Sequence, residues 1–144
     1  MRDNIILRIA ANILIPPILL FALYTQFHGD YGPGGGFQAG VIFAAGFILY
    51  GLIYGLDQMQ EVLPGGWARA LAGLGVLVFA GVGVAGIVLG GNYLDYDVLR
   101  HDPEHGQHLG ILLVELGVLT TVFGVMVTIF YAYAGRSRVG VEEE

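Results

Sequence analysis

The stretch HGDYGPGGGFQAG, residues His28–Gly40, separates two long apolar runs and contains six glycines and one proline. A tight turn needs only one or two such residues, because each of them relieves one particular constraint on the backbone. The excess of glycine indicates that another backbone lies close to this turn. What that other backbone is depends on the nature of the flanking runs.

The composition is that of an integral membrane protein. The 144 residues are 56% hydrophobic and 12% charged, with a mean hydropathy of +0.71. A membrane-spanning helix needs about 20 mostly apolar residues, and four runs meet this requirement: Ile9–Phe27, Phe37–Leu56, Ala68–Gly90 and Leu109–Ala134. The sequence therefore predicts an all-α, polytopic membrane protein with a single membrane domain over residues 1–144.

The basic residues predict the orientation of the chain, because arginines near the ends of spans are retained on the cytoplasmic side. Five of the six fall on one side of the membrane: Arg2, Arg8, Arg69, Arg136 and Arg138. Only Arg100 falls on the other side. Both termini are therefore expected to be cytoplasmic, with loops 28–36 and 91–108 facing outward.

Several classes of function are disfavoured by what the chain contains. The sequence has no cysteine, which removes disulfides, thiolate metal sites and cysteine nucleophiles from consideration. The four spans leave little chain for a catalytic domain, and no cofactor motif is present, so we expect neither an enzyme nor a cofactor. A net charge of −6 argues against binding to nucleic acid.

Glycines recur at helical spacing inside the spans. Glycine costs a helix roughly 1 kcal/mol relative to alanine, and in lipid small residues offset this cost by letting helices approach closely. Three sets follow this pattern: Gly36/Gly40/Ala44, Gly51/Gly55 and Gly83/Gly86/Gly90. We expect four helices alone to be too few to bury all of these faces, so the pattern favours a subunit of a larger assembly.

The opening stretch fits the same interpretation as a close-packing motif. Pro33 fixes its own φ angle, and Gly34 and Gly35 allow backbone angles closed to other residues. The motif continues into the second span through the following residues: Gly36, Phe37, Gln38 and Gly40. An ordinary hairpin turn is the alternative. A phosphate-binding loop is disfavoured because no GK[ST] follows.

Glu115 is the candidate for ion or proton handling. It lies six residues inside the fourth run, or about 9 Å from its outer end, and helical spacing places His108 on the same face. Charged groups inside spans normally face protein or water and mark ion pathways. Glu115 is therefore either a carboxylate that binds a proton or Na⁺, or a hydrogen-bonding anchor to a neighbouring subunit. The residues alone leave both possibilities open.

All four histidines fall on the predicted outer side: His28, His101, His105 and His108. His101 and His105 have the i, i+4 spacing of a helical metal site, but Pro103 lies between them and no carboxylate signature completes the set. We therefore predict no metal site. Nearby acidic residues make this side an acidic, titratable vestibule or simply a solvated loop.

Two stretches of the chain resemble a known family. The segment HGDYGPGGGFQAG at the start of the second span, and HGQHLGILLVELGVLTTVFGVMVTIF over His105–Phe130, are similar to the MnhB (also called MrpB) family of small membrane subunits from multisubunit Na⁺/H⁺ antiporters. Glu115 stands where some members carry Asp. The resemblance extends over nearly the whole chain and includes the number of spans.

The resemblance implies a small accessory subunit of a Na⁺/H⁺ antiporter in the plasma membrane of a prokaryote, a transporter component that serves sodium transport and pH homeostasis. Its expected partners are large antiporter-like subunits, which carry the principal proton path, and other small membrane subunits. The alternative is a structural subunit of a related redox-driven complex of the membrane-bound hydrogenase type. A homo-oligomeric channel is disfavoured, because no span carries the polar stripe that a water-filled lumen needs.

Overall fold

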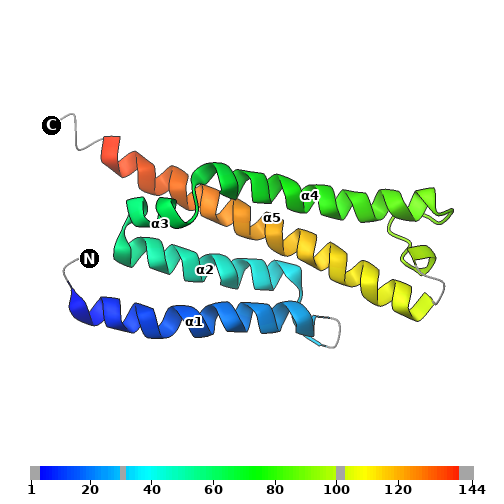
Figure 1. Cartoon of the computed structure of the whole chain (residues 1–144), viewed down its shortest axis with the longest axis horizontal. Coiled ribbons are helices and arrows are strands. Elements are labelled where there is room, and N and C mark those ends of the chain that lie inside the picture. The colour runs from blue at the N-terminus through cyan, green and yellow to red at the C-terminus, as the bar shows by residue number, and fades with distance from the viewer. Residues whose placement is uncertain (1–3, 30–31, 100–102, 140–144) are drawn as a thin grey trace.

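The computed structural model describes residues 4–29, 32–99 and 103–139 of the chain. Its helices are α1 (Ile5–His28), α2 (Gly36–Tyr54), α3 (Leu56–Val62), α4 (Gly65–Val88) and α5 (Pro103–Val139), with a short 3₁₀ helix η1 (Asp97–Leu99). Helices α1, α2, α4 and α5 are long and apolar enough to cross a membrane (Figure 1). The predicted all-α polytopic class with four spans is confirmed.

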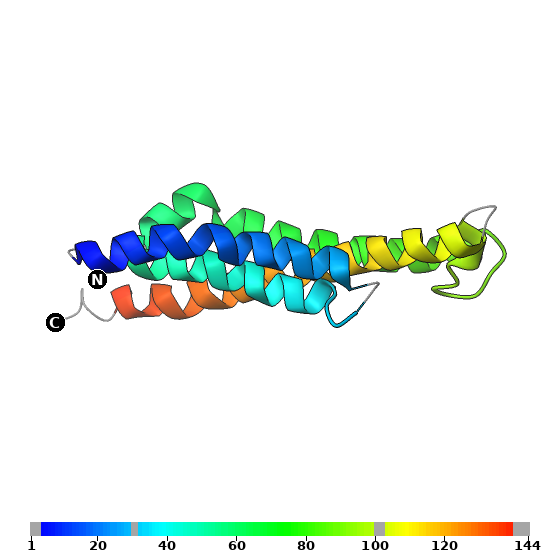
Figure 2. The same ribbon diagram turned by 90° about the horizontal axis from the view of Figure 1, so that it is seen from below.

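The four long helices lie side by side in one layer, in the order α1, α2, α5 and α4 (Figure 1). Helix α2 packs against α1 on one side and α5 on the other, and α5 also packs against α4. Seen from below, the helices are offset in depth, so the row is twisted rather than flat (Figure 2). A single row of helices leaves two broad faces to be covered by lipid or by other chains.

The start of α1 and the end of α5 lie at one end of the layer, which we call the inner end (Figure 1). Arg8 lies near the start of α1 and Arg69 near the start of α4 at this end, and Arg136 lies near the end of α5. The turn between α1 and α2 and the segment after α4 lie at the opposite, outer end. Arg2 and Arg100, which also entered the orientation prediction, lie outside the described residues.

Helices α1 and α5 are longer than the apolar runs that predicted them, because polar residues extend their ends. Helix α1 begins at an N-cap, Asn4, whose side chain accepts hydrogen bonds from the amides of Ile6 and Leu7. Helix α5 begins at Pro103 rather than Leu109. Proline suits a first helical position, since the missing N–H has no intrahelical partner there. Residues 103–108, expected in the outer loop, are therefore helical.

Helices α4 and α5 approach to backbone contact through their glycines. A methyl group at Gly75 would overlap the carbonyl of Gly117 and the hydroxyl of Thr121. One at Gly124 would lie 2.5 Å from the carbonyl oxygen of Ala68. The Thr121 hydroxyl in turn donates a hydrogen bond of 3.3 Å to the carbonyl of Ala72. Contacts of this closeness need residues without large side chains.

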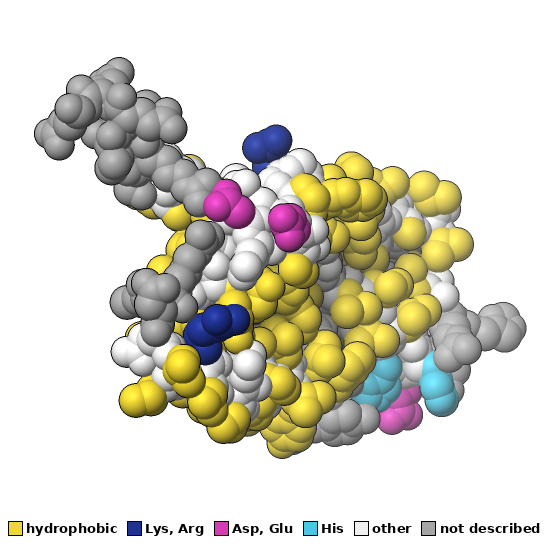
Figure 3. All heavy atoms as spheres, turned by 60° about the vertical axis from the view of Figure 1, so that its left-hand side comes forward, with side chains coloured by type: hydrophobic (Ala, Val, Ile, Leu, Met, Phe, Trp, Pro, Cys, Tyr) yellow, Lys and Arg dark blue, Asp and Glu magenta, His cyan; other side chains and the backbone are white. Residues whose placement is uncertain are grey.

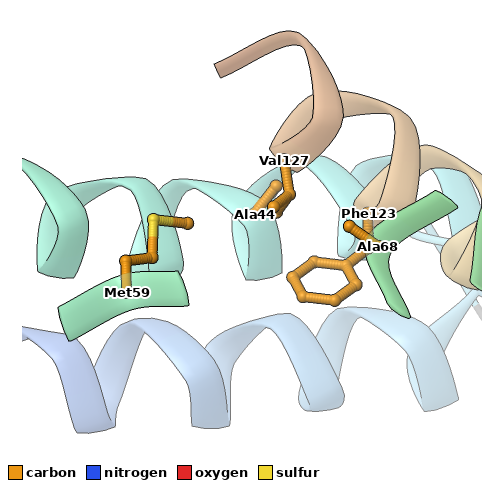
Figure 4. Packing of buried hydrophobic residues seen from close by; sticks show 5 residues of the cluster. All are labelled: Ala44, Met59, Ala68, Phe123 and Val127. Atoms are coloured by element: carbon orange, nitrogen blue, oxygen red, sulfur yellow. The ribbon is translucent and has the colours of Figure 1, made fainter. Parts of the chain in front are cut away.

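The buried core lies toward the inner end, where α2, α3, α4 and α5 meet. Its fully enclosed members are Ala44, Met59, Ala68, Phe123 and Val127 (Figure 4). The ring of Phe123 meets the rings of Phe43 and Phe47 edge-on, with centroids 5.3 and 5.1 Å apart. This edge-to-face arrangement is favourable for aromatic pairs. It fixes the register of α2 against α5.

The predicted glycine stripes are used mostly inside the chain. Gly36 and Gly40 pack on the α5 backbone, and Gly51 packs on Met59 and Phe130. Gly83 and Gly86 pack on Tyr93 and on the backbone of the segment that follows α4. Most of these positions are therefore buried within the chain, because α5 accepts glycine contacts on two sides and the outer segment folds back on α4, whereas Gly90 meets open space.

Much of the lateral surface is nevertheless exposed and apolar. Between 11% and 39% of the most apolar stretch of each span is buried inside the chain. Helix α4 also has glycines with no neighbour within 4 Å of an added methyl group: Gly66, Gly73 and Gly81. Within one helix, buried and open glycines can therefore be compared directly.

We predict that Gly75→Leu destabilises the chain by at least about 1–3 kcal/mol, because the new side chain must separate α4 from α5. Gly73→Leu, two residues earlier on the same helix, gains the same helix propensity. Its side chain, however, extends into open space. This variant should stay within roughly 0.5 kcal/mol of the unmodified chain. Thermal unfolding of both variants in mild detergent measures the difference. Equal unfolding temperatures for the two variants would contradict the close-packing account.

Candidate functional site

The glycine stretch folds the chain back sharply at the outer end. The amide of Gly35 donates a hydrogen bond of 3.1 Å to the carbonyl of Thr25, near the end of α1. Gly35 has a φ angle of +110°, which side-chain-bearing residues rarely adopt. A methyl group at Gly34 would lie 2.7 Å from the same Thr25 carbonyl. The turn therefore places the N-terminus of α2 beside the last turn of α1.

The first turn of α2 lies directly against α5 at Glu115. A methyl group at Gly36 would overlap the carbonyl oxygen of Glu115, so this position accepts no side chain without moving a helix. A methyl group at Gly40, one turn later, would lie 2.9 Å from the carbonyl oxygen of Leu119. The other backbone indicated by the excess glycine is thus α5 of the same chain.

The turn also surrounds the carboxylate of Glu115. Its Oε1 atom lies 2.7 Å from the position of a methyl group on Gly29 and 3.0 Å from one on Gly35. Gly35 is the N-cap of α2 and has no side chain to satisfy the free amides of the first turn. A helix N-terminus carries partial positive charge and favours a nearby anion. The carboxylate of Glu115 thus lies beside the N-terminus of α2.

Glu115 lies well inside α5 but close to the turn between α1 and α2. It stands twelve residues after the start of α5, yet it is level with the turn between α1 and α2 because α5 extends beyond that turn (Figure 1). Its side chain is only partly buried. The carboxylate thus lies at the outer end of the α1–α2 pair rather than deep within the row.

A pocket of about 310 Å³ opens beside this carboxylate. It is lined by Gln26, Phe27, His105, His108, Ile111, Leu112 and Glu115. The space is large enough for several water molecules. Figure 3 shows histidine side chains beside an acidic side chain on a surface that is otherwise largely hydrophobic. Glu115 and His108, the two residues predicted to handle ions, both line this pocket.

Gln26 is the site residue that sequence reasoning missed. Its side chain is 1% exposed, and neither its Nε2 nor its Oε1 atom has a hydrogen-bond partner among the residues that the structure describes. A single amide in an apolar run belongs to no motif. The available signal was its position one helical turn before Gly29, on a helix that ends at the glycine stretch.

The other predicted polar groups are placed elsewhere. His28 stacks on Tyr24 with ring centroids 5.1 Å apart, and His101 lies outside the described residues. Asp97, one of the vestibule carboxylates, accepts a hydrogen bond of 2.8 Å from the amide of Gln107. Within residues 4–29, 32–99 and 103–139, no three His, Cys, Asp or Glu side chains are grouped as a metal site.

Tyr96 closes the outer segment against α5. A methyl group at Gly110 would overlap its ring. Burial raises the pKa of the Tyr96 phenol, and the nearby Tyr93 raises it further. Tyr96 therefore stays neutral at physiological pH and acts here through packing.

Comparison with known proteins gives a consistent match. Residues 6–128 match the family described as "Domain related to MnhB subunit of Na+/H+ antiporter". A protein of Staphylococcus haemolyticus (strain JCSC1435), named "Putative antiporter subunit mnhB2", is 34% identical over 124 residues, covering 78% of this chain and 87% of that protein. The protein of the same name from Staphylococcus aureus (strain Newman) is 37% identical over 65 residues, covering 44% and 46% respectively.

The close contacts of the glycine turn predict which of its positions tolerate alanine. Gly36→Ala should destabilise the chain by about 1–3 kcal/mol, because the methyl group must displace the α5 backbone at Glu115. Gly32→Ala is the matched control, since its methyl group would meet the end of the His28 side chain, which can move aside. The amount of each variant in isolated membranes and its unfolding temperature in detergent measure the effect. If Gly36→Ala matched Gly32→Ala in both, α2 would not need this contact.

Proposed function

The chain belongs to the MnhB family, and from this premise we propose that it is a small accessory subunit of a multisubunit complex that exchanges Na⁺ for protons across a membrane. The family match over residues 6–128 is the observation that carries the proposal. The chain is a multi-pass membrane protein with four candidate spans. The complex would lie in the plasma membrane of a prokaryote, with both termini of this subunit cytoplasmic.

The subunit supplies part of an ion path rather than a complete one. Its four spans form a single row, and a row encloses no lumen between its helices (Figure 2). Its lateral surface is mostly apolar and exposed. Large antiporter-like subunits and other small membrane subunits would cover parts of this surface and carry the principal path. The chain is accordingly a transporter component and not an enzyme.

Glu115 is the group through which this subunit would take part in transport. The carboxylate lies at the N-terminus of α2, beside a pocket that also contains His105 and His108. A carboxylate at a helix N-terminus, inside a span and beside a partly apolar pocket, is a candidate for binding a proton or Na⁺.

We expect Glu115→Gln to lower Na⁺/H⁺ antiport about tenfold or more while the complex still assembles, because glutamine keeps the shape of the side chain and cannot exchange a proton. Glu115→Asp should retain part of the activity, since it keeps the charge and retracts it by one methylene. Antiport is measured in everted vesicles over a range of pH, with assembly quantified on the same membranes. Glu61→Gln, at an exposed position on α3 at the inner end, is the matched control.

An anchoring role makes the opposite forecast. If Glu115 serves only as a hydrogen-bonding anchor, Glu115→Gln should leave antiport nearly unchanged. Glu115→Leu should then lower the yield of the complex, because its partner loses a hydrogen bond at a cost of about 1–3 kcal/mol of stability. Unchanged antiport in Glu115→Gln at every pH, with normal assembly, would therefore remove ion handling from the function of this subunit.

A further inference from the structure

Gln26 is an unusual residue for the end of an apolar helix. Its side chain is almost fully buried between α1 and its neighbours, and both ends of its amide lack hydrogen bonds. Its neighbour Thr25, also buried, satisfies its hydroxyl by donating to the carbonyl of Phe21 at 2.8 Å. The packing at this level can therefore satisfy a polar group, yet the Gln26 amide is without a partner among the described residues.

An unsatisfied buried amide is costly. The desolvation penalty of such a group is roughly 1–3 kcal/mol, and an apolar side chain of similar shape would avoid it. The polar space that Gln26 adjoins is the pocket that it lines together with Glu115, His105 and His108. The amide is therefore best explained by an interaction within this pocket.

The chemistry of an amide indicates what that interaction is. An amide offers two N–H donors and one carbonyl acceptor, and both ends of Gln26 need partners. A metal cation would satisfy the oxygen alone. A carboxyl group, or water hydrogen-bonded to it, satisfies either end. An ionised carboxylate accepts from Nε2, whereas a protonated carboxylic acid donates to Oε1, so one amide can serve both protonation states of Glu115 by turning about its last bond.

We propose that Gln26 is a positioning residue for proton exchange at Glu115, and that its amide turns toward the carboxyl group across the pocket that both residues line. A proton passes from an imidazolium of His105 or His108 to a carboxylate oxygen of Glu115, which leaves a neutral imidazole and a carboxylic acid, and the reverse step returns it. The Gln26 amide lowers the difference in solvation between the two states of the carboxyl group. This inference rests on the proposed function of Glu115.

Among the described residues, the titratable groups that line this pocket belong to α5. They are His105, His108 and Glu115. Helix α1 contributes Gln26 and Phe27 to the lining, and its last residue, His28, is stacked on Tyr24. At the outer end of α2, the polar side chain is the uncharged Gln38. Its Oε1 atom lies 3.7 Å from the position of a methyl group on Gly35. A change at Gln26 should therefore alter the titration of the α5 groups.

The test is the pH profile of antiport in vesicles that contain the assembled complex. Gln26→Met keeps the length of the side chain and removes the amide. It should leave assembly unchanged and move the pH of half-maximal antiport upward by about one unit, because loss of a polar neighbour disfavours the ionised carboxylate. Gln26→Glu, which keeps the shape of the side chain, should also move it upward, since two close carboxylates resist joint ionisation. Gln60→Leu, at an exposed position on α3, is the control.

A double variant separates positioning from packing. In the Glu115→Gln background, the same Gln26 changes should no longer move the pH profile of whatever antiport remains. An unmoved profile for Gln26→Met and Gln26→Glu, in complexes where Glu115→Gln lowers antiport, would overturn this inference and leave the proposed function intact. A change confined to the Na⁺ concentration for half-maximal antiport would also overturn it, in favour of a cation site. If Glu115→Gln has no effect, the proposed function fails first.

Discussion

Close backbone contact along α5 is the constraint on which the rest of the structure depends. One side of α5 meets α4 through Gly75, Gly117 and Gly124, and the other meets α2 through Gly36 and Gly40. In lipid, apolar side chains gain little by leaving one hydrocarbon environment for another, so helix association depends on dispersion and on the closeness of approach. Without these glycines, α5 could not hold two neighbours at once. The row α1, α2, α5, α4 is a consequence of this single helix having two glycine-compatible faces.

The same contact links the fold to its chemistry. Gly36 brings the first turn of α2 against Glu115, and Gly29 and Gly35 leave room for the carboxylate itself. A side chain at any of these positions would displace either the helix or the acid. The glycine motif thus both allows α2 to pack closely on α5 and leaves space for the Glu115 carboxylate. Packing and electrostatics coincide here because a helix N-terminus can approach an anion closely only where no side chain intervenes.

The row also explains why the chain belongs in an assembly, although not for the reason that the glycine stripes first suggested. Those stripes are occupied mostly by the chain itself. What remains exposed are the two broad faces of the helix row and the open glycines of α4, Gly66, Gly73 and Gly81. The membership of the MnhB family, rather than the glycine count, carries the conclusion that other subunits surround it.

The sequence by itself determined the features that depend on hydropathy and composition over short windows. These are the four apolar spans, the all-α class, and a glycine-rich turn that another backbone must approach. It also singled out Glu115, because a carboxylate within an apolar run is conspicuous wherever the run folds. Tertiary structure alone decided that the approaching backbone is α5, that Glu115 is level with the α1–α2 turn, and that Gln26 is buried beside the same pocket as His108. Hydropathy is additive along the chain, whereas depth, burial and pairing of faces depend on which helices meet, and no single helix contains that information.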